Sequence, residues 1–287
     1  MTPTSLSNLV PDIYKVIDEG IQLTDTEKQK LGASLASAVL QGIGKQVHKP
    51  ELRMSNFGSK CERQLWYRVN RADLAEKLEP YVKFKFAYGH ILEALTIWLA
   101  KKAGHTVTGE QDELVIEGIK GHRDAVIDGV LVDVKSANSR GFLKFKDHAL
   151  LDDDPFGYMA QLSLYSYASR DDPLVEVKKE AAFLAIDKEQ GHIVLDKYKV
   201  LDKDYDKEVK SKKEMLERDT PPKRAYLPEA DGLSGNQKLG TACSYCAYKE
   251  ECWKESNQGQ GLRKFFYSNA PRWLVHVAKE PKVQEAR

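Results

Sequence analysis

The clearest feature of the hydropathy pattern is a pair of short apolar runs joined by Asp128-Gly129. This dipeptide is the strongest short hairpin signal, because a type I′ turn requires positive φ at both central positions. The pattern therefore predicts antiparallel strands over about 121–127 and 130–136, with Ile127 opposite Val130.

One face of this predicted hairpin carries charged side chains. Counting outward from the turn places Asp124 opposite Asp133 and His122 opposite Lys135, and these four side chains share a face. Directly opposed Cβ atoms are roughly 4.5–5.5 Å apart, where like charges destabilise the pairing. Two carboxylates at this distance favour a cation between them, and oxygen ligands favour Mg²⁺ or Mn²⁺. The alternative is an exposed charged face with a poorly placed aspartate pair.

The rest of the chain alternates helical and strand patterns. A capping box at residues 24–27 opens an N-terminal helix that ends near Gly42. Further helices are predicted over about 84–103, 156–169 and 203–218, and strands over about 105–108, 112–117, 181–187 and 192–199. This order is typical of an α/β fold with a mixed sheet flanked by helices.

Composition and charge narrow the class of protein. The 287 residues are 41% hydrophobic, and no apolar run approaches the ~20 residues of a membrane span, so we expect a cytoplasmic protein with no membrane partner. The net charge is +1, yet residues 45–71 hold seven Lys or Arg against two Glu. The positive charge of this stretch is compatible with a groove that binds the phosphate backbone of a nucleic acid. It is equally compatible with an ordinary solvated surface.

Three further segments supply candidate chemistry. Glu93 and Glu113 are candidates for a third oxygen ligand, and Glu93 is favoured because its apolar neighbours make an unpaired charge expensive. Lys135 can position an attacking water and stabilise charge in a phosphoryl-transfer transition state. Gln161 and Tyr165, at i and i+4 of one predicted helix, can orient a nucleotide or this lysine, although such a pair more often belongs to an ordinary amphipathic helix.

Four short motifs occur in a fixed order. Gly-x-x-x-Glu, Gly-His-x-Asp, Asp-x-Lys and Gln-x-x-x-Tyr stand at residues 89–93, 121–124, 133–135 and 161–165. In this combination the chain resembles the PD-(D/E)XK nuclease superfamily over about residues 55–255. It is most similar to the RecB-like branch, with its CRISPR-associated and AddB-like exonucleases and phage relatives. Many members have Glu-x-Lys as the third motif, and this branch often has His where Glu93 stands, which leaves the ligands of a second metal open.

The resemblance implies a restriction-endonuclease-like core and a role for each motif residue. The implied ligands of Mg²⁺ or Mn²⁺ are Glu93, Asp124, Asp133 and the carbonyl of Val134. The implied catalytic lysine is Lys135, supported by His122, Gln161 and Tyr165. DNA contacts are expected from Arg63, Arg68 and Tyr158.

The four cysteines predict one shared metal site. Cys243, Cys246 and Cys252 lie near the C-terminus, and Cys61 lies far upstream. Four thiolates with no cysteine to spare suggest a metal site in place of disulfides, and both zinc and iron–sulfur clusters accept four cysteines. One cysteine far upstream of three closely spaced cysteines, together with the sequence of segment 61–67, resembles the pattern in the iron–sulfur nucleases of the same branch. This favours a structural 4Fe–4S cluster over zinc or free cysteines.

These features predict three parts: a helical N-terminal appendage over 1–50, a nuclease core over 51–253 closed by the cysteines, and a tail over 254–287. The tail mixes cations with aromatic residues, which suits base stacking or packing on the core.

The predicted function is a metal-dependent DNA exonuclease that acts on ends or single strands in recombination, repair or processing, in a bacterial or phage-infected cell. No helicase phosphate-loop motif is present. The alternatives are a structure- or site-specific endonuclease and a DNA-end-binding subunit. Recombination partner proteins or a homo-oligomer are compatible with each of them.

Overall fold

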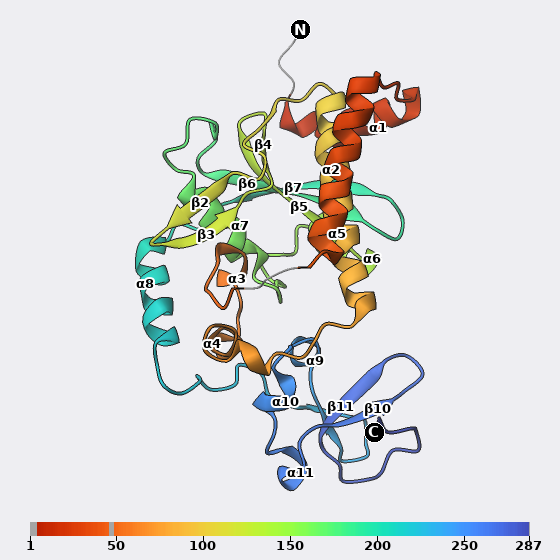
Figure 1. Ribbon diagram of the computed structural model, residues 1–287, viewed down its shortest axis with the longest axis vertical. Coiled ribbons are helices and arrows are strands. Elements are labelled where there is room, and N and C mark those ends of the chain that lie inside the picture. The colour runs from red at the N-terminus through yellow and green to blue at the C-terminus, as the bar shows by residue number, and fades with distance from the viewer. Residues whose placement is uncertain (1–4, 46–48, 287) are drawn as a thin grey trace. The chain divides into compact units, whose positions relative to one another are not determined.

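The computed structural model describes residues 5–45 and 49–286, and the chain divides into two compact units (Figure 1). The sheet unit comprises Met1–Lys49, Arg53–Gly58 and Glu79–Ser211. The cysteine unit comprises Pro50–Leu52, Ser59–Leu78 and Lys212–Arg287. This division differs from the three ranges predicted from the sequence, because the chain crosses between the units several times.

A five-stranded mixed sheet forms the centre of the sheet unit. In spatial order the strands are β1 (Val107–Thr108), β4 (Ala125–Ile127), β5 (Val130–Ala137), β6 (Glu180–Asp187) and β7 (Ile193–Lys199). The pair β5–β6 is parallel and the other neighbours are antiparallel. The predicted α/β class with a mixed sheet flanked by helices is confirmed.

Helices cover both faces of this sheet. One face packs against α1 (Leu9–Glu19) and α5 (Pro80–Lys102) through Ala182, Leu184 and Ile186 of β6. Phe183 points to the other face, where it contacts Phe145 of α6 (Ser139–Lys146) and Tyr158 of α7 (Tyr158–Ala168). The remaining helices of this unit are η1 (Leu6–Asn8), α2 (Asp25–Ile43), α3 (Met54–Phe57) and most of α8 (Tyr205–Leu216).

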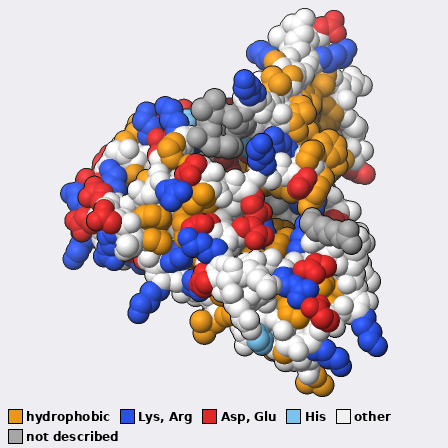
Figure 2. Space-filling model, turned by 60° about the horizontal axis from the view of Figure 1, so that its bottom comes forward, with side chains coloured by type: hydrophobic (Ala, Val, Ile, Leu, Met, Phe, Trp, Pro, Cys, Tyr) orange, Lys and Arg blue, Asp and Glu red, His pale blue; other side chains and the backbone are white. Residues whose placement is uncertain are grey.

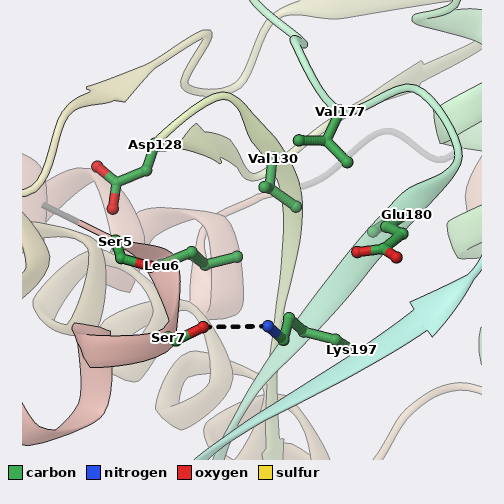
Figure 3. A pocket seen from close by; sticks show the side chains of 9 residues that line it. Ser5, Leu6, Ser7, Asp128, Val130, Val177, Glu180 and Lys197 are labelled. Carbon is green, nitrogen blue, oxygen red and sulfur yellow. Dashed lines mark hydrogen bonds between the residues drawn. The ribbon is translucent and has the colours of Figure 1, made fainter. Parts of the chain in front are cut away.

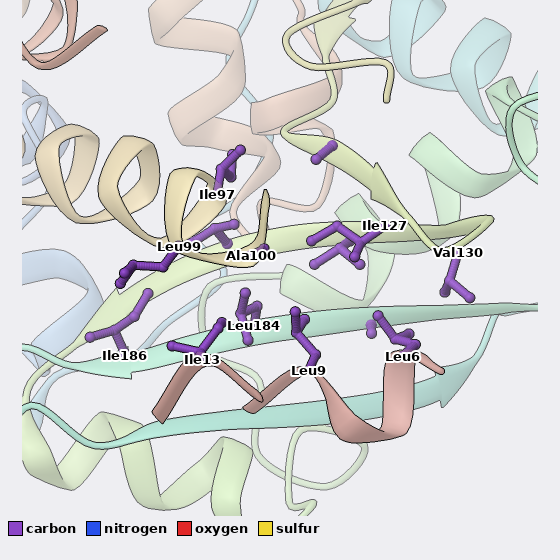
Figure 4. Close-up of a cluster of buried hydrophobic side chains, with 14 residues drawn as sticks. Leu6, Leu9, Ile13, Ile97, Leu99, Ala100, Ile127, Val130, Leu184 and Ile186 are labelled. Atoms are coloured by element: carbon purple, nitrogen blue, oxygen red, sulfur yellow. The ribbon is translucent and has the colours of Figure 1, made fainter. Parts of the chain in front are cut away.

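The N-terminal helices belong to the core of the sheet unit. Leu9 and Ile13 of α1 are fully buried and point toward Leu184 of β6 (Figure 4). The predicted capping box at Thr24 is present, with the Thr24 side chain accepting from the backbone N–H of Glu27. Residues 6–21 therefore do not form a peripheral appendage, because their apolar side chains complete the packing on one face of the sheet, whereas α2 packs against α5.

The hairpin register matches the prediction close to the turn and departs from it further out. Ile127 pairs with Val130, and φ is positive at both Asp128 and Gly129. The strand predicted over 121–127 is, however, broken at Arg123 and Asp124. Its first part belongs to a separate two-stranded sheet, β2 (Glu113–Ile116) with β3 (Ile119–His122). His122 therefore lies opposite Glu113 and not opposite Lys135.

The cysteine unit contains short elements around a four-stranded sheet. The sheet order is β10 (Arg263–Phe266), β11 (Pro271–His276), β9 (Gln237–Lys238) and β8 (Glu229–Ala230). The helices are α4 (Glu62–Asn70), η2 (Ala72–Leu74), α9 (Thr241–Ser244), α10 (Lys249–Cys252) and α11 (Ser256–Gly259). Phe265 and Leu274 are buried, so much of the predicted basic and aromatic tail is packed β-structure.

Candidate functional site

Strand β5 carries the two central residues of the candidate site. Asp133 and Lys135 alternate with the core residues Val132 and Val134, so both point to the face that Phe183 also occupies. The two side chains form an ion pair. Burial lowers the pKa of Lys135, but the charges of Asp133 and Asp124 outweigh this effect and hold the pKa above its ordinary value. Lys135 is therefore a firmly charged ammonium group in a buried setting.

Asp124 is held against β5 by a backbone hydrogen bond. The N–H of Val134 donates to Oδ2 of Asp124 at 2.7 Å. Burial, followed by the charges of Asp133 and Glu93, raises the pKa of Asp124 well above its ordinary value. The sequence count that placed Asp124 beside Asp133 is thus correct in effect, although Asp124 reaches β5 from the irregular segment after β3.

Glu93, and not Glu113, is the third carboxylate near this pair. Burial and the charge of Asp133 raise the pKa of Glu93 to about 7. Its Oε1 accepts from Nε2 of Gln111 at 2.7 Å. Glu113 instead forms an ion pair of 2.8 Å with Lys120 on the β2–β3 hairpin. The structure therefore selects between the two glutamates that the sequence left as candidates.

Tyr165 packs beside the carboxylates and explains one glycine of the motifs. Burial and the charges of Asp133 and Asp124 raise the pKa of Tyr165 to about 12, while a hydrogen bond with Gln161 opposes the shift. A Cβ atom on Gly121 would come within 2.8 Å of the Tyr165 ring. Glycine at this position thus lets the aromatic ring approach the backbone.

The helix that carries Gln161 and Tyr165 begins later than predicted. The sequence predicted this helix from about residue 156, but α7 starts at Tyr158 after Gly157, whose φ is +75°. Asp154 still caps the helix, because its carboxylate accepts from the N–H groups of Tyr158 and Met159 at 2.9 Å each. Tyr158 is half-buried, and its ring centroid lies 5.2 Å from Nζ of Lys135.

Arg123 is a structural residue of the site that the sequence reasoning missed. Its side chain is 1% exposed and forms ion pairs with Asp112 at 2.7 Å and Asp172 at 2.6 Å. Its Nε also donates to the Gly109 carbonyl at 3.1 Å. These contacts fix the break between β3 and β4, and so they position the adjacent Asp124. Hydropathy alone offered no signal, because the acidic partners come from distant loops.

Two cavities border the sheet unit. One of about 630 Å³ lies between α2 and α5 and reaches Glu93 and Asp124. The other, of about 370 Å³, lies beside the Asp128 turn and contains a hydrogen bond from Lys197 to Ser7, as Figure 3 shows. Of these two cavities, the first is the one that opens onto residues of the candidate site.

The carboxylates match the chemistry of a hard cation, although each has another partner in this structure. Asp133 pairs with Lys135, Asp124 with the Val134 N–H, and Glu93 with Gln111. Within the described residues, no group of three or more His, Cys, Asp or Glu side chains is arranged to hold a metal ion. Yet burial and the charge of Asp133 raise the pKa of both Glu93 and Asp124, and a divalent cation would relieve the repulsion between the carboxylates.

The four cysteines all belong to the cysteine unit and none forms a disulfide. Burial raises the pKa of Cys243 to about 11, and the charges of Cys246, Cys61 and Cys252 add to the shift. Burial likewise raises the pKa of Cys246 to about 11, with further contributions from Cys61 and Cys252. The four thiols therefore lie near one another, although no three or more of the described His, Cys, Asp and Glu side chains are arranged to hold a metal ion. Trp253, Leu239 and Val275 pack against Cys243 and Cys252.

The predicted DNA-binding arginines differ in their surroundings. Arg63 donates through Nη1 to the Pro222 carbonyl at 2.8 Å and through Nη2 to the Tyr67 hydroxyl at 3.2 Å. Two of its donors are thus engaged within the cysteine unit, whereas Arg68 is exposed. The basic stretch itself is divided between the two units, and residues 46–48 lie outside the described part of the chain. On the face shown in Figure 2, cationic and anionic side chains are interspersed without a broad region of one sign.

Every helix within the described residues is too short or too polar to traverse a lipid bilayer.

Comparison with known proteins does not assign this chain to a family. No family model and no curated protein matches this chain. Among solved structures, one titled "Crystal structure of SSO0001" aligns with a TM-score of 0.41 and 14% sequence identity, covering 77% of this chain and 93% of that one. Similarity at this level carries no argument about fold or function.

Proposed function

We propose that this protein is a metal-dependent deoxyribonuclease with an active site of the PD-(D/E)XK type. The observation that supports it most is the group formed by Asp133 and Lys135 on β5 with Asp124 and Glu93 beside them. Asp133 is buried, and Glu93, Asp124 and Lys135 are half-buried beside it. Burial and neighbouring charges raise the pKa of Glu93 and Asp124, and the charges of Asp133 and Asp124 hold the pKa of Lys135 above its ordinary value. Such clusters of perturbed groups are concentrated at functional sites.

The residues of the group have distinct proposed roles. Glu93, Asp124, Asp133 and the Val134 carbonyl would hold Mg²⁺ or Mn²⁺. When bound, the cation would act as a Lewis acid on the phosphodiester and would lower the pKa of water. For Asp133 to become a ligand, its carboxylate must share or give up its ion pair with Lys135. The freed ammonium group of Lys135 is then available to stabilise charge on the phosphate oxygens.

Gln161 and Tyr165 have a positioning role in this proposal. Tyr165 is buried and stays protonated near neutral pH, because its pKa is about 12. It is therefore a neutral group beside the charged ones, and its hydrogen bond with Gln161 fixes its orientation. His122 has no such support, because it is exposed on β3 opposite Glu113.

The four cysteines support a structural 4Fe–4S cluster as part of the same proposal, with zinc as the rival metal. They come from two distant segments of the cysteine unit: Cys61 stands before α4, Cys243 lies in α9, Cys252 lies in α10, and Cys246 lies between these two helices. A metal joined to all four would close a long loop of the chain and would add its binding free energy to folding.

The test of this function is digestion of end-labelled linear single- and double-stranded DNA, with circular DNA as the control, in Mg²⁺ and in Mn²⁺. We expect linear substrates to be degraded from their ends, single strands faster, and activity to disappear in EDTA. Cleavage of closed circles would favour a structure- or site-specific endonuclease. Binding to ends without hydrolysis in either metal would reject the nuclease and favour an end-binding subunit of a recombination complex.

Arg68→Glu should weaken DNA binding for all sequences. Arg68 is exposed in the basic stretch, and removing one phosphate neutralisation should lower the slope of log affinity against log salt by about 0.9 on a duplex and about 0.7 on a single strand. Lys223→Glu is the matched control, because Lys223 is also an exposed cation of the cysteine unit but lies outside the stretch. If Arg68→Glu, Lys223→Glu and the wild type all show the same salt slope, the basic stretch over residues 45–71 is an ordinary solvated surface.

A further inference from the structure

The N-terminal half of α5 exposes four aromatic side chains within eight residues. Tyr81, Phe84, Phe86 and Tyr88 are 64%, 55%, 51% and 43% exposed. Aromatic residues usually dominate buried cores and interfaces, so a cluster of this kind on a helix surface indicates an interaction site. The function proposed above assigns no role to this segment.

Three of these residues form one stripe along α5. Tyr81, Phe84 and Tyr88 follow the i, i+3, i+7 spacing of a single helical face, and the rings of Phe84 and Tyr88 touch with centroids 4.8 Å apart. The same face continues into Leu92, Leu95 and Leu99, which pack against the sheet. The helix therefore presents one continuous apolar face, and the sheet covers only its C-terminal half.

The exposed half of α5 is also cationic. Lys83 and Lys85 alternate with the aromatic residues, and no Asp or Glu occurs in α5 before Glu93. Nζ of Lys85 lies 5.6 Å from the centroid of the Tyr81 ring. Lysine is depleted from protein–protein interfaces, whereas aromatic rings interleaved with lysines match the bases and phosphates of a single strand.

The stripe lies on the same rigid helix as a residue of the candidate site. Glu93 lies five positions after Tyr88, which corresponds to about 8 Å along the helix axis. A strand lying along this segment would therefore approach the carboxylates within the length of a few nucleotides.

We infer that the N-terminal half of α5 is a stacking platform for single-stranded DNA, with Tyr81, Phe84 and Tyr88 contacting bases and Lys83 and Lys85 contacting phosphates. The inference rests on the proposed function for the identity of the ligand. It gives the expected preference for single strands a physical basis, because a platform that contacts base faces requires unpaired bases and is indifferent to their sequence.

The test compares a short thymidine oligonucleotide with an abasic strand of the same length, both in EDTA so that no cleavage occurs. Stacking is worth about 1–3 kcal/mol per base, so Phe84→Ala should weaken binding of the thymidine strand roughly 5- to 150-fold. Binding of the abasic strand should change little. Ile17→Ala on α1 is the control, because Ile17 is a 48% exposed apolar residue of the same unit.

Phe84→Trp provides a second readout that a merely structural role would not change. Relative to the wild type, its additional indole emission should be quenched by the thymidine strand and not by the abasic strand, while affinity is retained. The proposal of a stacking platform is overturned if Phe84→Ala weakens binding of the thymidine and abasic strands equally. It is also overturned if neither strand changes the indole emission of Phe84→Trp. Cleavage is not measured, so these outcomes are independent of whether the protein hydrolyses DNA.

Discussion

Asp133→Asn is expected to abolish DNA cleavage while leaving the fold and DNA affinity close to those of the wild type. The substitution keeps the size of the buried side chain and removes the charge that pairs with Lys135 and that we propose to bind a cation. A neutral amide is a poor ligand for Mg²⁺ at this position, so the cation affinity of the group should fall with it. Rates of single-strand digestion at saturating metal give the measurement, and thermal melting verifies the fold.

Asp196→Asn is the matched control for this substitution. Asp133 is registered opposite Phe183, and Phe183 opposite Asp196, so the two aspartates lie in one row across the sheet. Both are buried, but Asp196 pairs with His148 at 2.6 Å and not with the candidate lysine. Asp196→Asn should retain cleavage. If Asp133→Asn cleaves DNA at nearly the wild-type rate, the three carboxylates do not form the active site.

Lys135→Ala should reduce cleavage about 10²–10³-fold, the usual effect of losing one group that stabilises transition-state charge. Its effect should not add to that of Asp133→Asn, since the two side chains act as one ion pair. A double variant that is much slower than either single variant would contradict their joint role.

Cys61→Ser should yield a protein that loses its iron and unfolds at a lower temperature. Anaerobically purified wild type should be brown and hold about four irons per chain, as expected for a cubane bound by four cysteines. Cys61 is the proposed ligand from the N-terminal part of the cysteine unit, and its loss should detach that part from the segment with the other three cysteines. Because metal binding is linked to folding, the free energy of unfolding should fall by several kcal/mol.

Tyr245→Ala is the control for the cysteine variant. Tyr245 stands between Cys243 and Cys246 but is 87% exposed, so iron content and melting should be retained. A colourless wild type with one zinc would keep the four-thiolate site and reject the cluster. Full metal content and unchanged melting in Cys61→Ser would exclude Cys61 from the site. In Cys61→Ser and in Tyr245→Ala, nuclease activity should decrease only in proportion to the loss of folded protein, because the cluster is proposed to be structural.

Local signals in the sequence determined much of the sheet unit. Asp128-Gly129 fixed the turn between β4 and β5, and period-two alternation then put Asp133 and Lys135 on one face. The capping box at Thr24 marked the start of α2. These predictions were correct because a turn, a cap and a strand face depend on residues a few positions apart, which interact with one another wherever the segment lies in the fold.

Only the tertiary structure decided where distant segments meet. His122 was displaced to a second hairpin because Arg123, buried between Asp112 and Asp172, breaks the strand just before Asp124. The sequence favoured Glu93 over Glu113 from its apolar neighbours, but only the packing shows that Glu93 lies near Asp133 and Asp124. Ion pairs between residues far apart in sequence, and the burial that gives them their strength, leave no periodic trace in the chain, so they become visible only when the helices and strands are assembled.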